Sequence, residues 1–116
     1  MGPMTRLLAI ALLLPALAAA ESTSRQSFAT TLAPGQSHEA CSTLAAGDSR
    51  NYHWKSDAAV DFNIHYHDGN KVMTPVERKG MRGDGGTFKA KVAQDYCWMW
   101  SARDKPAKVS GSVDSK

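Results

Sequence analysis

Long hydrophobic runs are scarce in this sequence, and the one near its N-terminus is too short for a membrane anchor. The stretch from Leu7 to Leu17 is apolar apart from one proline, which is about half of the ~20 residues that a membrane-spanning helix needs. Arg6 precedes this stretch, and three alanines, Ala18 to Ala20, follow it, as in a secretory signal peptide. We therefore expect residues 1–20 to be a cleaved signal peptide that leaves no transmembrane anchor.

An excess of charge of one sign is also lacking. The chain has 14 lysines and arginines against 11 aspartates and glutamates, and these charges are scattered along the sequence. A protein that binds nucleic acid would show a basic stripe with interleaved aromatic residues. This composition therefore excludes nucleic acid as the expected partner. The chain beyond residue 20 has the length of one domain with one core.

Cysteine is rare, since only Cys41 and Cys97 are present. In an exported chain the default interpretation of two cysteines is a single disulfide. Such a bond would close a loop of about 57 residues, which the chain-entropy model values at roughly 4 kcal/mol of stability. The alternative is two free thiols, or one thiol active in redox chemistry. The sequence has no C-x-x-C motif to favour that alternative.

Catalytic signatures are missing as well. No serine or cysteine lies in a recognised nucleophile motif. We therefore expect a protein that is not an enzyme and that uses no obligatory cofactor.

Helix signals are hard to find beyond residue 20, whereas turn residues recur every eight to twelve positions, as in an all-β sandwich or barrel. We expect an all-β fold, a small antiparallel β-sandwich of roughly seven to eight strands with one disulfide. It should span residues 27–113, between a flexible leader at 21–26 and a tail at 114–116. The expected strands are 27–32, 39–43, 49–54, 60–67, 71–76, 87–92, 96–102 and 108–113. The glycine-rich segment 80–86 is expected to be a mobile loop.

Two of these segments show which side chains face the core. The alternation from Val60 to His67 puts Val60, Phe62, Ile64 and Tyr66 on one face and the polar residues on the other. The segment from Tyr96 to Trp100 is apolar on both faces, which is typical of a central, covered strand.

The polar face of the first segment offers a candidate metal site. His65 and His67 are two residues apart on an expected strand, so both imidazoles point the same way, and His53 could supply a third nitrogen. Imidazole ligands suit Cu(II) or Zn(II). The alternative is a solvated strand face that carries ordinary histidines.

The tryptophans offer a candidate binding surface. Trp54, Trp98 and Trp100, with Tyr66, could form an aromatic platform for a partner. The alternative is that the indoles fill the core, and at least two of the three are expected to do so.

The order of these segments resembles the GOLD domain, the β-sandwich of the p24 (emp24/gp25L) cargo-receptor family. The resemblance runs through these segments in chain order: Cys41, Trp54-Lys55-Ser56, Val60 to Ile64, Asp68 to Val72, Gly86 to Ala90 and Tyr96-Cys97-Trp98. It implies that Cys41 pairs with Cys97. The late cysteine of p24 proteins comes about two residues further after the tyrosine, where this chain has Met99. The p24 proteins also continue into a coiled coil and a transmembrane helix, whereas this sequence ends at Lys116.

The resemblance therefore implies a sandwich with a general protein-interaction role. We expect an exported, non-enzymatic binding module in the periplasm or secreted from the cell, with a protein or a small ligand as its partner. The alternative is a periplasmic protein that binds copper or zinc through His65 and His67.

Overall fold

A computed structural model describes residues 25–115, and all of their regular structure is β-strand. The strands are β1 (Arg25–Leu32), β2 (Ser37–Leu44), β3 (Ser49–Asp68), β4 (Lys71–Lys89), β5 (Gln94–Ala102) and β6 (Ala107–Ser115). Every paired strand runs antiparallel to its neighbour. The expected all-β, antiparallel class is confirmed. No helix within the described residues could cross a membrane, and the expected signal peptide, residues 1–20, lies outside them.

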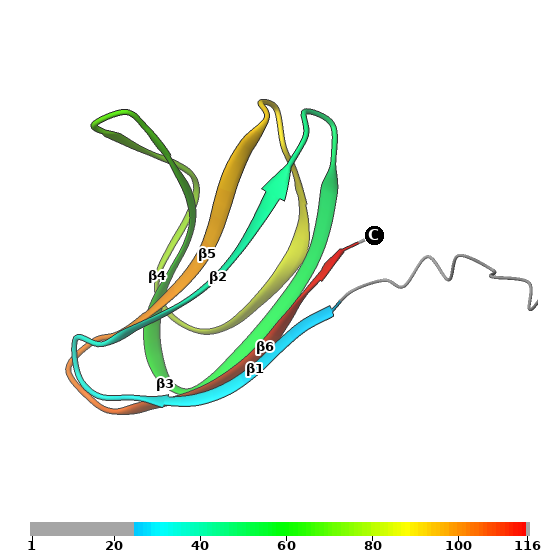
Figure 1. Cartoon of the computed structure of the whole chain (residues 1–116). Coiled ribbons are helices and arrows are strands. Elements are labelled where there is room, and N and C mark those ends of the chain that lie inside the picture. The colour runs from blue at the N-terminus through cyan, green and yellow to red at the C-terminus, as the bar shows by residue number, and fades with distance from the viewer. Residues whose placement is uncertain (1–24, 116) are drawn as a thin grey trace, which may run out of the picture.

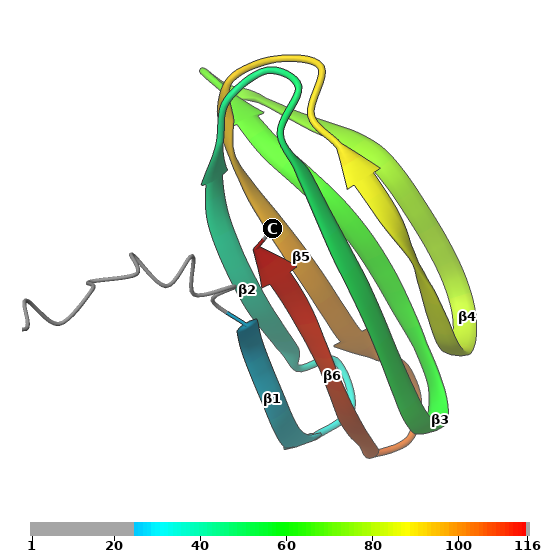
Figure 2. The same cartoon turned by 90° about the vertical axis from the view of Figure 1, so that its right-hand side faces the viewer.

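The six strands form one sheet that curls around the core (Figure 1). The order is β1-β6-β3-β5-β2, and β4 lies beside β3. The first half of β3, from Arg50 to Ser56, pairs with β6, and the second half, from Val60 to His65, pairs with β5. Because one strand serves both halves, the sheet closes into a half-barrel. Figure 2 shows the two long strands β3 and β4 running along its whole length.

The curl has a local cause in the register of β3 against β4. Between the pairs Lys55–Gly83 and Val60–Met81, β3 advances five positions and β4 only two, so β3 bulges and bends there. Further along, β4 carries an extra residue near Gly80, whose φ of 66° is a backbone conformation that glycine adopts at little cost. These irregularities let a long hairpin turn the corner without breaking.

The expectation of seven to eight strands in a sandwich is therefore corrected to six strands in one curled sheet. The segments expected at 49–54 and 60–67 are the two halves of β3, and those at 71–76 and 87–92 belong largely to β4. The expected mobile loop at 80–86 is part of β4 and pairs with β3. Bulges interrupt the alternation of side chains, so each long strand looks like two in the sequence.

The core lies between the two halves of the sheet. Its buried side chains come from every strand: Leu32, Leu44, Tyr52, Trp54, Val60, Phe62, Ile64, Phe88, Ala90, Tyr96, Trp98, Trp100, Ala102, Ala107, Val109 and Val113. Phe62 stands at the centre of an aromatic cluster, with ring centroids 5.5 Å from Tyr52, Trp54 and Trp100. The predicted inward face of Val60, Phe62 and Ile64 is confirmed.

The edge strands β1 and β2 approach each other where the half-barrel nearly closes. Phe28 of β1 stacks on His38 of β2, with ring centroids 4.6 Å apart, and also contacts Trp100. The Gln26 side-chain amide donates to the Cys41 carbonyl oxygen across the same gap. These contacts cover that side of the core.

The predicted disulfide is confirmed. Cys41 of β2 and Cys97 of β5 lie directly opposite each other in the register and are bonded. The bond ties an edge strand to a central strand, over a sequence separation of 56 residues.

The ends of the folded unit reach beyond the expected range 27–113. Arg25 forms an ion pair with Asp114, 3.0 Å between Nε and Oδ1, in the β1–β6 ladder. β1 therefore begins within the expected leader, and β6 continues into the expected tail.

Candidate functional site

A concave, mostly apolar cleft opens between the two halves of β4. We call it the β4 cleft, and its volume is about 510 Å³. Figure 1 shows how β4 bends back on itself, so that residues far apart along this strand face each other. Its lining residues are Tyr66, Pro75, Val76, Phe88, Lys89, Lys91, Val92 and Tyr96. A cleft with an apolar lining and a few charged groups is the usual form of a ligand site.

The floor of the β4 cleft is built from aromatic rings in edge-to-face contact. Tyr96 contacts Tyr66 on one side and Phe88 on the other, with ring centroids 5.2 and 5.0 Å away. The Tyr96 hydroxyl donates to the Val92 carbonyl oxygen at 2.7 Å. This bond anchors the segment between β4 and β5 to the floor, so the cleft is held in shape by the core beneath it.

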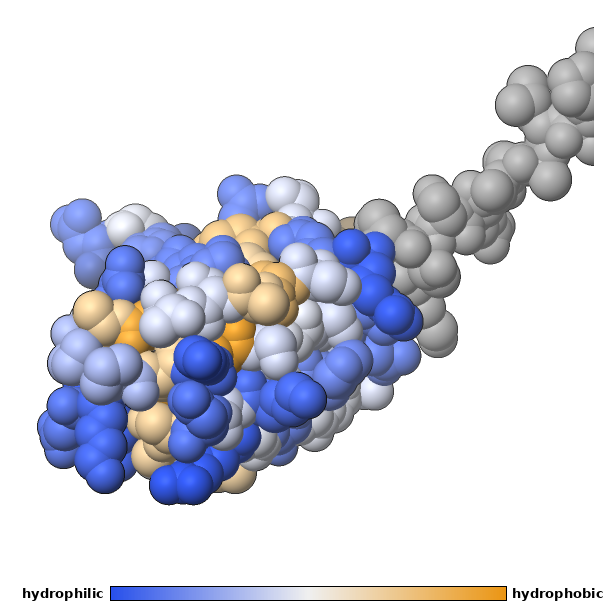
Figure 3. All heavy atoms as spheres, turned by 90° about the horizontal axis from the view of Figure 1, so that it is seen from below, coloured by the Kyte–Doolittle hydropathy of each residue, from blue (hydrophilic) through white to orange (hydrophobic). Residues whose placement is uncertain are grey.

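Apolar side chains are exposed in the cleft and next to it. Val92 keeps 45% of its surface exposed, and Met73, which pairs with Tyr66 in the β3–β4 register, keeps 41%. Val72 is exposed too, at 57%, but it is the next residue along the strand and so faces the other side of the hairpin. On the face of the molecule that Figure 3 shows, hydrophilic side chains surround the apolar ones.

The charge of the cleft is positive. Lys89 and Lys91 are exposed and line it, and none of its lining residues is acidic. An occupant that carries a carboxylate or another anion is therefore favoured over a cationic one.

The structure places the predicted aromatic platform differently. Trp54, Trp98 and Trp100 are at most 3% exposed, because their indoles fill the core between the two halves of the sheet. They are not available as a surface for a partner. Of the predicted binding residues, only Tyr66 lies in the β4 cleft.

The predicted histidines do not form one group. His65 and His67 lie side by side, with ring centroids 5.3 Å apart, on the face of β3 that points away from the core. His53 lies on the other half of β3, where its Nδ1 is 3.2 Å from the Ser112 hydroxyl. Strand parity puts all three on the outer side of β3, but the bend of β3 separates His53 from the pair.

His65 has different neighbours from those predicted. Its ring is buried, its Nδ1 is 2.7 Å from Asn63 Oδ1, and its Nε2 is 3.8 Å from Glu39 Oε1. The donor atoms of Glu39, His65 and Cys97 all lie within 4.8 Å of one another. Since Cys97 is bonded to Cys41, its sulfur is not a thiolate ligand in this state.

One ionisable side chain in the core has a shifted pKa. Burial raises the pKa of the Tyr52 hydroxyl above its ordinary value, and the nearby Asp84 carboxylate raises it further, whereas Arg78 acts in the opposite direction. Tyr52 therefore stays neutral in the folded protein over an extended pH range.

The cleft residues Val76, Phe88, Val92 and Tyr96 were not predicted as binding residues. They come from three separate segments of the chain, and only the bend of β4 brings them together. The one signal in the sequence was the alternation within the expected strand 87–92, which puts Phe88, Ala90 and Val92 on one apolar face.

Comparisons with known proteins support the fold and nothing finer. No family model matches this chain, the GOLD domain included, and no curated protein is similar to it in sequence. Among solved structures, the Yersinia pseudotuberculosis-derived mitogen aligns with a TM-score of 0.56 at 10% identity, over 81% of this chain and 87% of the mitogen. This likeness shows a shared small all-β fold.

Two further structures are more distant. A de novo designed double-stranded β-helix has a TM-score of 0.45 at 13% identity, over 76% of this chain and 97% of the design. The periplasmic inhibitor of g-type lysozyme from Aeromonas hydrophila has a TM-score of 0.48 at 10% identity, over 81% of this chain and 90% of the inhibitor.

Proposed function

We propose that this protein is a non-enzymatic binding module that holds an apolar, negatively charged segment of a partner protein in the β4 cleft. The observation that carries the proposal is the cleft itself, in which aromatic rings and a half-exposed valine line a concave space beside two lysines. Apolar side chains left in a concave surface cost free energy in water, and such surfaces commonly mark interaction sites.

The free edge of β4 favours an extended segment as the occupant. Within residues 25–115, β4 pairs with β3 alone, so the other edge of β4 has backbone groups free to pair. A strand added along this edge would place alternate side chains towards the cleft. Pro75 and the bulge near Gly80 interrupt the first half of the edge, whereas residues 83–89 pair with β3 in unbroken register. The second half is therefore the better place for an added strand.

The sequence supports the same class of function. Its resemblance to the GOLD domain implies a protein-interaction role, and a GOLD-like relationship is part of this proposal. The Cys41–Cys97 disulfide supports a place outside the cytoplasm, in the periplasm or secreted, because such bonds persist in oxidising compartments.

The test uses the dye 8-anilinonaphthalene-1-sulfonate, which combines aromatic rings with one negative charge. The parent protein should bind it with one saturable site and enhanced fluorescence. Val92→Glu puts a carboxylate at the cleft and should weaken binding about tenfold or more, since one apolar side chain contributes ~1.5 kcal/mol or more when buried.

The matched control is Val72→Glu. It makes the same substitution at another exposed valine, on the other side of the β3–β4 hairpin. Dye affinity should equal that of the parent. Equal weakening by both variants, or by neither, would contradict the proposal.

A peptide panel then tests the class of partner. Extended peptides with one apolar core sequence, flanked by aspartates in one set and by lysines in the other, should bind only when acidic, and Val92→Glu should abolish that binding. Preference for the basic set would contradict the proposed partner.

A further inference from the structure

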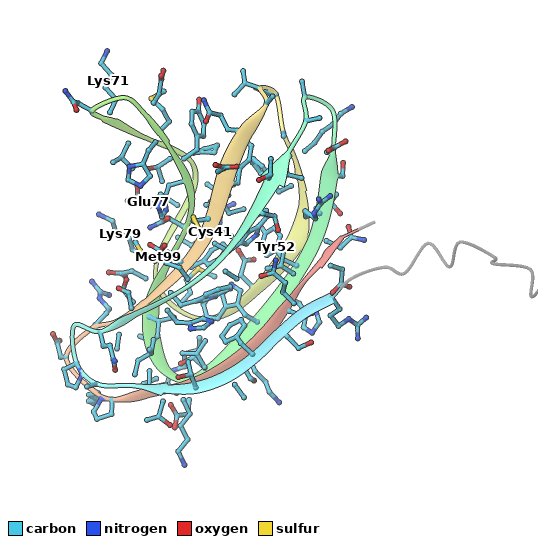
Figure 4. All side chains as sticks on the ribbon, in the orientation of Figure 1. Cys41, Tyr52, Lys71, Glu77, Lys79 and Met99 are labelled. Atoms are coloured by element: carbon cyan, nitrogen blue, oxygen red, sulfur yellow. A yellow bond between two sulfur atoms is a disulfide. The ribbon has the colours of Figure 1, made fainter. Side chains whose placement is uncertain are left out.

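A second cluster of side chains lies on the outer face of the sheet, around the disulfide. In the registers of β2, β5 and β3, Cys41 lies opposite Cys97, and Cys97 lies opposite His65. The neighbouring row brings Glu39 opposite Met99, and Met99 opposite Asn63. Figure 4 shows Cys41 and Met99 close together on this face. Two cysteine sulfurs, one imidazole and one carboxylate thus share one small area.

The distances within this cluster are close to those of a four-coordinate metal centre. His65 Nε2 is 3.8 Å from Glu39 Oε1, Cys41 Sγ is 3.9 Å from Glu39 Oε2, and the donor atoms of Glu39, His65 and Cys97 fall within 4.8 Å of one another. Zinc bonds of about 2.0–2.3 Å in a tetrahedron put neighbouring donor atoms roughly 3.3–3.8 Å apart. Only the two sulfurs, which are bonded to each other, are too close.

The imidazole is already oriented for coordination. Asn63 Oδ1 can only accept a hydrogen bond, so Nδ1 of His65 must donate in the 2.7 Å contact. A neutral His65 therefore carries its lone pair on Nε2, the nitrogen that faces Glu39. A hydrogen bond from the second ring nitrogen is the usual way in which proteins fix a metal-binding histidine. His65 is also only 5% exposed, so its ring is held in place.

We propose that reduction of the disulfide creates a zinc site from Cys41, Cys97, His65 and Glu39. A protein dithiol supplies two electrons and two protons, the S–S bond becomes two thiols, and the dithiol leaves as its own disulfide. Zn(II) then displaces the two thiol protons and binds two thiolates, Nε2 and one carboxylate oxygen. Cys41 is an exposed residue, so a reductant can reach the disulfide from its side.

In the oxidised state only two of the four proposed ligands, Glu39 and His65, can still bind a metal, because the two sulfurs are bonded to each other. Two ligands do not make a structural zinc site, which needs four. The disulfide and the metal therefore exclude each other, and the oxidation state of one cysteine pair decides whether zinc binds. This donor set keeps His65 from the set predicted from the sequence and differs from it in leaving out His67 and His53, which lies beside Ser112.

The experiment compares oxidised and reduced protein in zinc titrations against a chromophoric chelator. Reduction uses a phosphine, which takes its oxygen from water and is removed under argon before zinc is added. The reduced parent should bind one zinc per chain, and the oxidised parent should bind none in competition with the chelator. Cobalt substitution should give thiolate-to-metal charge-transfer bands in the reduced protein alone.

Single-residue variants test which side chains zinc binding requires. Asn63→Ala removes only the partner of Nδ1 and should weaken zinc binding by about 10- to 100-fold. His65→Ala and Glu39→Ala each remove a ligand and should weaken it more. The matched control, His53→Ala, removes a histidine from the outer face of the other half of β3 and should leave the affinity unchanged.

Far-UV circular dichroism of the reduced protein shows whether the chain that binds zinc is folded. A β-spectrum that persists on reduction, or that zinc restores, supports the site. Zinc binding to a chain that stays unfolded would overturn the proposal, because unfolded cysteines can bind metal without any site. Equal affinity in the parent and His65→Ala, or no zinc binding after reduction, would overturn it as well.

Discussion

Gly111 of β6 lies directly opposite Trp54 of β3, and the missing side chain of the glycine leaves room for the Cα and Cβ atoms of the tryptophan. A Cβ atom on Gly111 would lie 2.7 Å from Trp54 Cβ and 2.5 Å from the His53 carbonyl oxygen, both too close for carbon. The two strands can approach here only because one of them carries a glycine. Trp54 depends on this approach, because it packs against Phe62 in the core.

Gly111→Ala should therefore destabilise the protein by about 1–3 kcal/mol, as overpacking of a filled interior does. The measurement is the free energy of unfolding in guanidinium chloride. Gly86→Ala is the control, since a Cβ there would meet only the Tyr52 side chain, at ordinary contact distances of 3.4 Å and more. A larger loss at Gly86 than at Gly111 would contradict the packing described at Trp54.

Removal of the disulfide should cost stability through the unfolded chain. The double variant Cys41→Ala, Cys97→Ala releases a loop closed over 56 residues, so the free energy of unfolding should fall by about 4 kcal/mol. Denaturant unfolding of the parent, with and without reductant, and of the variant provides the measurement. An unchanged midpoint in all three samples would show that the bond between β2 and β5 does not constrain the fold.

Tyr52 should make the protein sensitive to alkali. Its folded-state pKa is raised above the ordinary value of about 10 by burial and by Asp84, so the folded protein holds the proton more tightly than the unfolded chain does. The resulting stability is complete below about pH 10 and is lost as the pH rises through the folded-state pKa. Tyr52→Phe should show a smaller loss of stability above about pH 10 than the parent does. Identical pH profiles for both proteins would contradict this assignment.

The lysines of the β4 cleft should control its preference for anions. Lys89→Gln with Lys91→Gln removes two charges worth up to about 1 kcal/mol each, so affinity for 8-anilinonaphthalene-1-sulfonate should fall by about 5- to 30-fold. Binding by the parent should weaken as salt increases, and binding by the double variant should not. Lys105→Gln with Lys108→Gln makes the same change of charge outside the cleft and should behave as the parent does. An equal loss in both double variants would point to net charge rather than to the cleft.

The sequence predicted the fold class and the chemistry of single strands well. The alternation around Phe62 identified the buried face of β3, and the two cysteines identified the disulfide, because both signals are local or nearly unambiguous. The expected strands 60–67 and 71–76 also placed the turn of the long hairpin between them, where Gly69 has a positive φ.

The curl of the sheet could not be predicted from the sequence. The bend between Lys55 and Val60 and the bulge near Gly80 divide two long strands into apparent pieces, and glycines that read as a loop belong to a paired strand. The β4 cleft and the Glu39–His65 contact both depend on which strands become neighbours. That choice is made by the whole core, so no short segment of sequence carries it.

The most direct test of the β4 cleft is to map where the anionic dye binds on the folded protein. Amide proton and nitrogen shifts of ¹⁵N-labelled protein, followed during titration with 8-anilinonaphthalene-1-sulfonate, should change most at Val76, Phe88 and Val92 and should saturate together. Changes centred instead on His53 and Ser112 on the other half of the sheet, or no saturable change at all, would contradict the proposed binding site.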